Sequence, residues 1–428
     1  MTTFQQRVAL RFPALASRDF VIFWAGQFIS LIGTWMQSTT LPYLTYRLTG
    51  SSLALGIVGF ATTLPTLFLA LPGGVIVERL DKRKAVIALQ IVMMLQAFAL
   101  AYLTLSSKIE LWQIVALSFV LGAAGAVEIT ARQAMLVELV GKPALPNAIA
   151  LQATIFNTAR VLGPLLVAPF LLIFPRNGEG WAFFFNGVSY LFVIVGLMFV
   201  RTPFKAVGRI GVESSLRGEF REGMRYIYRT QVIWLMLIMA AVVGFFGFPF
   251  TQQIPALARD VLAVTGEAAS SVAARNSALY AAQGVGALIA ALYLAIYSNT
   301  GRMGRLLLGG QLAFIFALIL ISTVRTLPPA LILITFLGWG TVTQLATMNT
   351  LIQLEVPDYL RGRVFSAYLW ALQGIAPFGS LAVGWLAQNL GVPAAALIVG
   401  LICLVVIGGL HLRYPVVRNL TGSVSELA

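Results

Sequence analysis

The stretch Gly74-Val-Ile-Val-Glu78-Arg79-Leu-Asp81-Lys82-Arg83-Lys84 carries six charges between two long apolar runs. The run before it, 53–77, and the run after it, 85–105, contain no charged residue. Each run is long enough to cross a bilayer as a helix, so the charged stretch must lie in water or among lipid headgroups. Four of its charges are Arg or Lys, and the positive-inside bias places it in the cytoplasm. That orientation fixes the direction of every other helix.

The composition is that of a helical membrane protein. Of 428 residues, 59% are hydrophobic and only 10% are charged, whereas a soluble domain has about 25% charged residues. The apolar runs are about 20 residues long and lack the alternation of barrel strands. The net charge of +14 is explained by cytoplasmic loops that face anionic lipid, so we expect no nucleic-acid partner.

A single cysteine, Cys403, excludes an internal disulfide, and a single histidine, His411, excludes a histidine-cluster metal site. We expect His411 to be a surface residue at the cytoplasmic end of the last helix. The sequence has neither a phosphate-binding loop nor a Ser-His-Asp set, so we predict no enzymatic activity, no cofactor and no metal.

Twelve apolar spans follow one another along the chain, and we predict that each is a transmembrane helix. They lie near 20–46, 52–77, 84–106, 111–133, 147–174, 181–200, 232–257, 271–297, 305–325, 329–352, 364–389 and 393–412. An even number of crossings puts both termini on the side of the charged stretch. Arg and Lys number 21 on that side and 6 on the other, which predicts cytoplasmic termini in the cell inner membrane.

The predicted domain organisation follows from these spans. We expect a cytoplasmic N-terminal segment, two six-helix bundles joined by a basic linker with an amphipathic helix over 216–228, and a cytoplasmic tail. The corresponding ranges are 1–19, 20–200, 201–231, 232–412 and 413–428.

The two halves resemble each other at corresponding positions. Glu78-Arg79 to Arg83 follows the second span, and Gly301-Arg302-Met-Gly304-Arg305 follows the eighth. Glu138 ends the fourth span and Glu355 ends the tenth. Two related halves predict a transporter, with alternating access around a site near the bilayer midplane.

These motifs resemble those of the major facilitator superfamily. The helix 2–3 signature of that family is matched by Gly74, Glu78, Arg79, Lys82 and Arg83, although Glu78 replaces the usual Asp and Asp81 the usual Gly. Gly163-Pro164 in the fifth span resembles the antiporter motif of the family. The segments 33–37, 48–51 and 361–366 look more narrowly like the exporter branch that contains enterobactin and macrolide efflux proteins. The resemblance covers almost the whole chain and implies a twelve-helix fold of two pseudo-symmetric halves.

Charged residues at the cytoplasmic ends of the spans are candidates for a gate. We expect Arg79 or Arg83 to contact Glu138, and Glu355 to pair with Arg302 or Arg305 in the second half. Lys82 and Lys84 are expected to face lipid headgroups and only to set topology. The alternative is that the whole charged hairpin faces lipid headgroups and only sets the topology of the helices.

Inside the membrane, Glu128 and Arg160 are the candidates for proton coupling. Arg160 lies about 13 residues into the fifth span, which is about 20 Å of helix rise and near the midplane. Adjacent helices could bring the two side chains together, so that each lowers the burial cost of the other. The alternative is a static structural ion pair.

The remaining candidates for a substrate cavity are neutral amides and aromatics, which suit an amphiphilic ligand. Their alternative role is packing between helices. They are Gln27, Trp35, Gln37, Gln252, Gln253, Tyr280, Gln283, Gln344, Asn349, Trp370 and Gln373.

We interpret the chain as a monomeric secondary transporter that exports small amphiphilic molecules of drug, macrolide or siderophore type by proton antiport. A translocator of lipids or lysophospholipids is a second interpretation. A membrane protein that acts as a receptor without transport is a third.

Overall fold

The computed structural model describes residues 12–78, 81–174, 177–204, 216–264, 266–297 and 302–421. Within these ranges the regular secondary structure is helical throughout. Eleven helices among the described residues are long and apolar enough to cross a membrane. The predicted all-α membrane fold is therefore confirmed.

One very long helix, α5 (Leu111–Ile173), accounts for two of the predicted spans. It contains 63 residues, or about 95 Å of helix, which is about three times the thickness of the hydrocarbon core. Gly141 breaks it with φ 73° and ψ 163°, a backbone region that glycine enters easily and other residues rarely do. Pro143 and Pro146 follow immediately. With two arms in α5, the eleven long helices supply the twelve predicted crossings.

The other helices of the first half match the predicted spans within a few residues. They are α2 (Arg18–Thr49), α3 (Ser52–Glu78), α4 (Lys82–Leu105) and α6 (Gly178–Phe199). Asp81 caps α4 by accepting a hydrogen bond from the Lys84 backbone nitrogen. The charged stretch that ends one helix therefore also starts the next.

Two crossings of the second half are interrupted by π-helical segments. The first runs through α8 (Gln231–Val242), the π-segment Val243–Gly247, α9 (Phe248–Thr251), α10 (Ile254–Ala256) and the π-segment Leu257–Val261. The second runs through α14 (Asp358–Leu369), the π-segment Trp370–Gly374 and α15 (Ala376–Leu390). The regular helices of this half are α11 (Ala269–Tyr297), α12 (Met303–Ile321), α13 (Leu327–Glu355) and α16 (Val392–Arg413).

The chain divides into two compact units. Unit 1 combines Met1–Leu44 with Phe68–Ile210, and unit 2 combines Thr45–Leu67 with Gly211–Ala428. The tip of the α2–α3 hairpin thus belongs to unit 2. There, a Cβ on Gly56 would lie 2.5 Å from the Ser380 carbonyl oxygen, so the glycine lets α3 approach α15 closely.

In unit 1, α4 packs against α6 and against α5. Small residues bring these helices together: a Cβ on Gly187 of α6 would lie 2.6 Å from the Phe98 ring of α4. Similarly, a Cβ on Gly26 of α2 would lie 2.7 Å from the Phe192 carbonyl oxygen. Such contacts are how helices associate where lipid offers no hydrophobic driving force between them.

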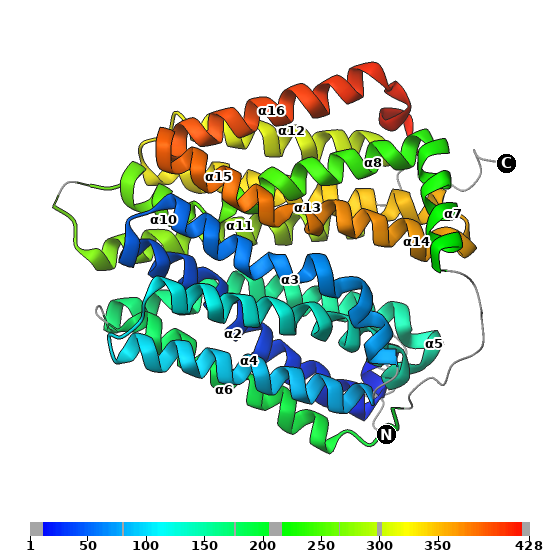
Figure 1. Cartoon of the computed structure of the whole chain (residues 1–428), viewed down its shortest axis with the longest axis horizontal. Coiled ribbons are helices and arrows are strands. Elements are labelled where there is room, and N and C mark those ends of the chain that lie inside the picture. Colours follow the sequence, from blue (N-terminus) through cyan, green and yellow to red (C-terminus); the bar gives the residue numbers. More distant parts are fainter. Residues whose placement is uncertain are drawn as a thin grey trace. The chain divides into compact units, whose positions relative to one another are not determined.

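In unit 2, α13 packs against α11 and α12, and α12 also packs against α16 (Figure 1). This arrangement overturns the expectation for His411, which is 3% exposed. Its Nε2 atom lies 2.6 Å from Oε1 of Gln311 on α12. The histidine is buried because the last turn of α16 still faces a neighbouring helix.

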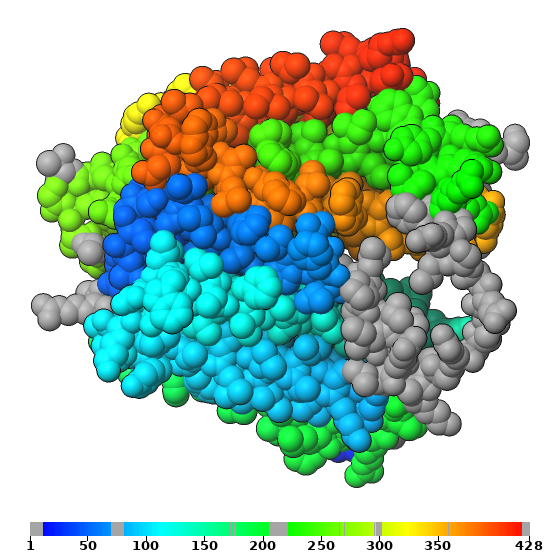
Figure 2. All heavy atoms as spheres, in the orientation of Figure 1, coloured from blue at the N-terminus to red at the C-terminus, as the bar shows by residue number. Residues whose placement is uncertain are grey.

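Large apolar side chains cover the outer surfaces of several helices. Leu95 and Tyr102 of α4 are 58% and 65% exposed, and Val405 of α16 is 72% exposed. Figure 2 shows broad surfaces formed by α4, in cyan, and by α16, in red. Exposed apolar surface on a membrane-length helix is expected to face lipid.

A short amphipathic helix, α7 (Leu216–Arg229), lies in the basic linker between α6 and α8. Within unit 2 it packs against α8 and α14. An ion pair between Arg363 and Glu222 joins α14 to α7, and the Tyr226 hydroxyl donates to the Glu355 carbonyl oxygen at 3.2 Å. Burial raises the pKa of the Tyr226 hydroxyl above its usual value.

Candidate functional site

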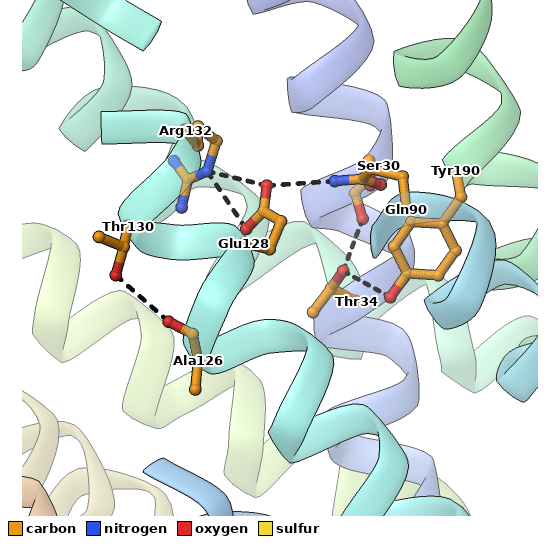
Figure 3. A network of polar contacts seen from close by, with 8 residues as sticks. All are labelled: Ser30, Thr34, Gln90, Ala126, Glu128, Thr130, Arg132 and Tyr190. Carbon is orange, nitrogen blue, oxygen red and sulfur yellow. Dashed lines mark hydrogen bonds and ion pairs between the residues drawn. The ribbon is translucent and has the colours of Figure 1, made fainter. Parts of the chain in front are cut away.

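Glu128 is a buried carboxylate in the first arm of α5, and it is 5% exposed. Gln90 on α4 donates to Glu128 through Nε2 at 3.2 Å. Arg132, one helical turn further along α5, approaches the same carboxylate at 3.2 Å (Figure 3). The charge is thus neutralised by an ion pair and held by an amide from a second helix, which lowers the cost of burying it.

A second polar chain lies in the same region of unit 1. The Thr34 hydroxyl of α2 donates to the Ser30 carbonyl oxygen at 2.9 Å and lies 3.4 Å from the Tyr190 hydroxyl of α6 (Figure 3). Tyr190 is 1% exposed.

Arg160 lies in the second arm of α5 and has an aromatic partner. Its guanidinium carbon is 5.3 Å from the centroid of the Trp35 ring on α2. Its Nε atom is buried and has no hydrogen-bond partner. A Cβ on Gly163 would lie 2.5 Å from the Trp35 Cβ, so glycine at this position is what allows the two helices to approach each other.

The expected meeting of Glu128 and Arg160 is wrong. Glu128 binds Arg132 and Gln90, whereas Arg160 stacks on Trp35. The reason is local: Arg132 is four residues from Glu128 on the same helix face, while Arg160 follows the break at Gly141. The spacing of Glu128 and Arg132 was a signal in the sequence that could have predicted this pair.

The cytoplasmic hairpin also differs from expectation. Lys82, expected to face headgroups, is 4% exposed and forms an ion pair with Glu138. Arg83 instead donates to the Val200 carbonyl oxygen at 2.8 Å. Lys82 is the first residue of α4, and its side chain is directed toward α5. It therefore pairs with Glu138 in place of the predicted Arg83. Arg79 and the side chain of Glu78 lie outside the described residues, and Gly74 is described only as part of the α3 backbone.

The corresponding pairing in the second half does not occur. Within the described part of the chain, Glu355 forms no ion pair with Arg302 or Arg305, both of which are exposed. The charged contact at this end of unit 2 is instead between Glu222 and Arg363. The two charged hairpins therefore differ in their contacts although their sequences correspond.

Several of the predicted cavity residues contact neighbouring helices. Asn186 donates to Gln37 at 2.8 Å, and Gln37 donates to Gln96 at 3.2 Å. Tyr280 and Gln283 donate to the carbonyl oxygen and hydroxyl of Thr251, each at 3.2 Å. Gln253 donates to the Ser52 carbonyl oxygen at 3.3 Å, whereas Asn349 accepts a hydrogen bond from Gln353 within the same helix, α13.

Other predicted cavity residues have unused polar atoms or exposed surfaces. Oε1 of Gln27 and both amide atoms of Gln344 are buried without a hydrogen-bond partner. Trp370 is 52% exposed, Gln373 is exposed and Gln252 is partly exposed. Since helix packing leaves the polar atoms of Gln27 and Gln344 unsatisfied, these two amides are the stronger candidates for ligand contact.

Unit 2 contains a polar cluster that the sequence analysis missed. The Tyr46 hydroxyl donates to Asp260, and the Arg259 guanidinium lies 5.6 Å from the Tyr46 ring. Ser51 donates to Gln388 at 2.9 Å. A cavity of about 380 Å³ adjoins the cluster and is lined by Tyr46, Asp260, Arg325 and Gln388 among others. The signal was the adjacent charges Arg259 and Asp260 at the end of a span.

Comparison with known proteins identifies the family of the chain. The model of a family described as transmembrane secretion effectors matches residues 10–424. The chain is 25% identical to the staphyloferrin A transporter of Staphylococcus aureus over 90% of this chain and 94% of that protein. It is 22% identical to macrolide efflux protein A of Streptococcus pyogenes over 91% and 94% of the two chains.

The fold is similar to that of the nucleoside transporter NupG, a point mutant of which superposes with a TM-score of 0.73. Identity is 10%, and the match covers 93% of this chain and all of the other. The predicted resemblance to the major facilitator superfamily is thereby confirmed, and the relatives are transporters rather than enzymes. The chain belongs to the transmembrane secretion effector family of the major facilitator transporters.

Proposed function

We propose that this transporter exports small amphiphilic molecules in exchange for protons. The observation that carries the proposal is Glu128, a buried carboxylate within a membrane span that is joined to Arg132 and Gln90. Ionisable groups at such positions are rare and commonly mark proton or ion pathways. Two relatives, a macrolide efflux protein and a staphyloferrin A transporter, support a small-molecule cargo.

Protonation of Glu128 supplies a physical mechanism for coupling. The neutral acid would lose most of its attraction to Arg132, and the Arg132 charge would then be left without its counterion. That cost favours a rearrangement of α5 against α4, where Gln90 contacts the carboxylate. A proton can drive transport only because it stabilises one arrangement more than the other.

The ion pair between Lys82 and Glu138 is our proposed cytoplasmic clasp. It joins the start of α4 to the end of the first arm of α5, and Glu138 is 27% exposed in its side chain. One Glu138 oxygen is buried without a hydrogen-bond partner, so the carboxylate can accept a further donor. Such a partly satisfied contact is suited to being made in one state and broken in another.

We further propose that the protein acts as a monomer in the cell inner membrane with both termini in the cytoplasm. The support is the bias of Arg and Lys toward the loops on the side of the termini. The burial of Lys82 does not weaken this bias, because the lysine pairs with Glu138 at the helix end.

Transport by purified protein in liposomes tests the proposal. With an acidic lumen, we expect accumulation of N-phenyl-1-naphthylamine, an uncharged amphiphile, and its loss when an ionophore removes the pH gradient. Glu128→Gln, reconstituted at equal amount, should not accumulate the dye. Equal gradient-driven accumulation by the variant would refute a coupling role for Glu128. Absence of flux by the wild-type protein for dyes, macrolides, siderophores and lysolipids would favour a receptor.

A further inference from the structure

Arg160 differs from Arg132 and Arg275, which also lie within membrane-length helices. Arg132 pairs with Glu128, and Arg275, 7% exposed, pairs with Glu267. In the part of the chain that the structure describes, Arg160 has no ion pair. It lies 13 residues before the end of α5, about 20 Å along the helix, so the charge is deep in the span. An uncompensated charge at this depth is costly.

Arg160 donates no hydrogen bond to another residue in the described part of the chain, and its Nε atom is buried. A guanidinium has five N–H donors in a rigid plane, and Trp35 contacts only one face of that plane. Nε is buried and without an acceptor. Buried polar groups in native proteins are nearly always satisfied, and an exception calls for an unseen partner. The partner that fits a charged planar fork is an anion with two oxygens.

The surroundings of Arg160 suit an aromatic anion. Trp35 stacks on the guanidinium, and the Phe156 ring lies edge-on to Trp35 with centroids 5.5 Å apart. Gln152, eight residues before Arg160, has both amide atoms buried without partners, and it lies about 12 Å away along the helix. Gln27 on α2 has an unpartnered Oε1 eight residues before Trp35. The helices α2 and α5 thus carry a guanidinium, two aromatic rings next to it and two more distant amides.

We propose that Arg160 and Trp35 bind an anionic group, a carboxylate or sulfonate, of an aromatic amphiphilic substrate. The inference rests on the proposed export function and narrows its substrate class. Arg160 supplies the charge and the paired donors, and Trp35 stacks against both the guanidinium and the aromatic part of the ligand. The site selects against cationic amphiphiles because they would place a second positive charge beside Arg160.

Two dyes with the same ring system provide the test. 8-Anilinonaphthalene-1-sulfonate carries an anionic group that N-phenyl-1-naphthylamine lacks. Equilibrium dialysis against the protein in lipid nanodiscs, with empty nanodiscs subtracted, measures the affinity for each. We expect Arg160→Gln to weaken binding of the sulfonate about tenfold or more, as for loss of a charge-assisted pair. Binding of the neutral dye should change by less than about twofold.

Arg160→Lys keeps the charge but removes the planar fork, so an intermediate loss of sulfonate affinity is expected. Arg160→Lys also replaces Arg160→Gln in the test if the glutamine variant does not fold. Loss of neutral-dye binding by the glutamine variant would reveal that case. Arg413→Gln is the matched control, since Arg413 is exposed and lies 5.5 Å from the Tyr414 ring. This control should leave both affinities unchanged.

The outcomes separate the two proposals. Unchanged sulfonate affinity in both Arg160 variants overturns the anion site, as does equal weakening of both dyes by Arg160→Lys. Wild-type protein that binds the neutral dye but not the sulfonate also overturns the anion site, and leaves export of neutral amphiphiles standing. Wild-type protein that binds neither dye contradicts the proposed substrate class as a whole.

Discussion

Two pairs of helices, one in each unit, show how the halves of the molecule have diverged. In unit 1, α2 meets the second arm of α5 at Gly163, where Arg160 stacks on Trp35. In unit 2, the crossings that contain α8 and α15 meet at Gly244 and Gly379, whose added Cβ atoms would lie 1.9 Å from carbonyl oxygens. The first pair is regular and charged, whereas the second is interrupted by π-segments and has no charge at the contact.

The contact in unit 1 holds a charged side chain, whereas the contact in unit 2 has an irregular backbone. A charge can be held in place only by helices that position its partners well, as α2 does with Trp35. π-Segments interrupt the regular ladder of backbone hydrogen bonds and are frequent at functional sites. We infer that unit 1 recognises charge, and that the irregular crossings of unit 2 allow helices to change their path.

The largest effect is expected from Gly244→Ala in unit 2. The new Cβ would lie 1.9 Å from the Leu372 carbonyl oxygen. Because this oxygen belongs to the backbone, no side-chain rotation can relieve the clash. We expect about 3 kcal/mol of destabilisation, measured as a shift in unfolding by sodium dodecyl sulfate. Gly309→Ala, where no atom lies within 4 Å of the added Cβ, is the control and should be neutral or slightly stabilising.

Gly163→Ala should have a smaller effect in unit 1. The added Cβ would lie 2.5 Å from the Trp35 Cβ and 2.9 Å from the Met36 backbone nitrogen. Regular helices can shift apart by a few tenths of an ångström, so we expect about 2 kcal/mol. The same unfolding titration measures it. A cost larger than that of Gly244→Ala would mean that the contact in unit 2 adjusts to an added methyl group more readily than the contact in unit 1 does.

The buried amides of unit 1 provide a third comparison. Gln37→Leu removes the group that accepts from Asn186 and donates to Gln96. Both partners would remain buried with unsatisfied atoms, which costs about 1.5 kcal/mol. A matching substitution at the exposed Gln373 should cost little. Equal losses at the two positions would indicate that the amides of unit 1 have no special packing role.

The smallest effect is a pH dependence in unit 2. Hydrogen bonds from Arg275 lower the pKa of the Glu267 carboxyl below its usual value. Because the folded-state pKa is lower than the unfolded one, the contribution is full above the unfolded pKa and disappears as pH falls through the folded pKa. We expect stability to drop by less than about 1 kcal/mol on acidification. Glu267→Gln should remove this part of the dependence of stability on pH. If the variant and the wild-type protein lose the same stability on acidification, another group is responsible for the loss.

Much of the fold could be predicted because span length and charge are properties of the sequence alone. The twelve spans and the buried position of Glu128 follow from hydropathy and spacing. So does the amphipathic helix predicted over 216–228, which the structure has as Leu216–Arg229. The partners of charged groups could not be predicted, since they depend on which helix faces which. Lys82 binds Glu138, and His411 binds Gln311 across helices. The π-segments also left no signal in composition.

The most direct test of proton coupling through Glu128 in unit 1 compares two transport modes of Glu128→Gln in liposomes. Exchange of labelled for unlabelled N-phenyl-1-naphthylamine without a pH gradient requires only that the protein alternate. Accumulation against a concentration gradient also requires proton coupling. We predict that the variant retains exchange within about twofold and loses accumulation. Retained accumulation at the wild-type level would contradict the account.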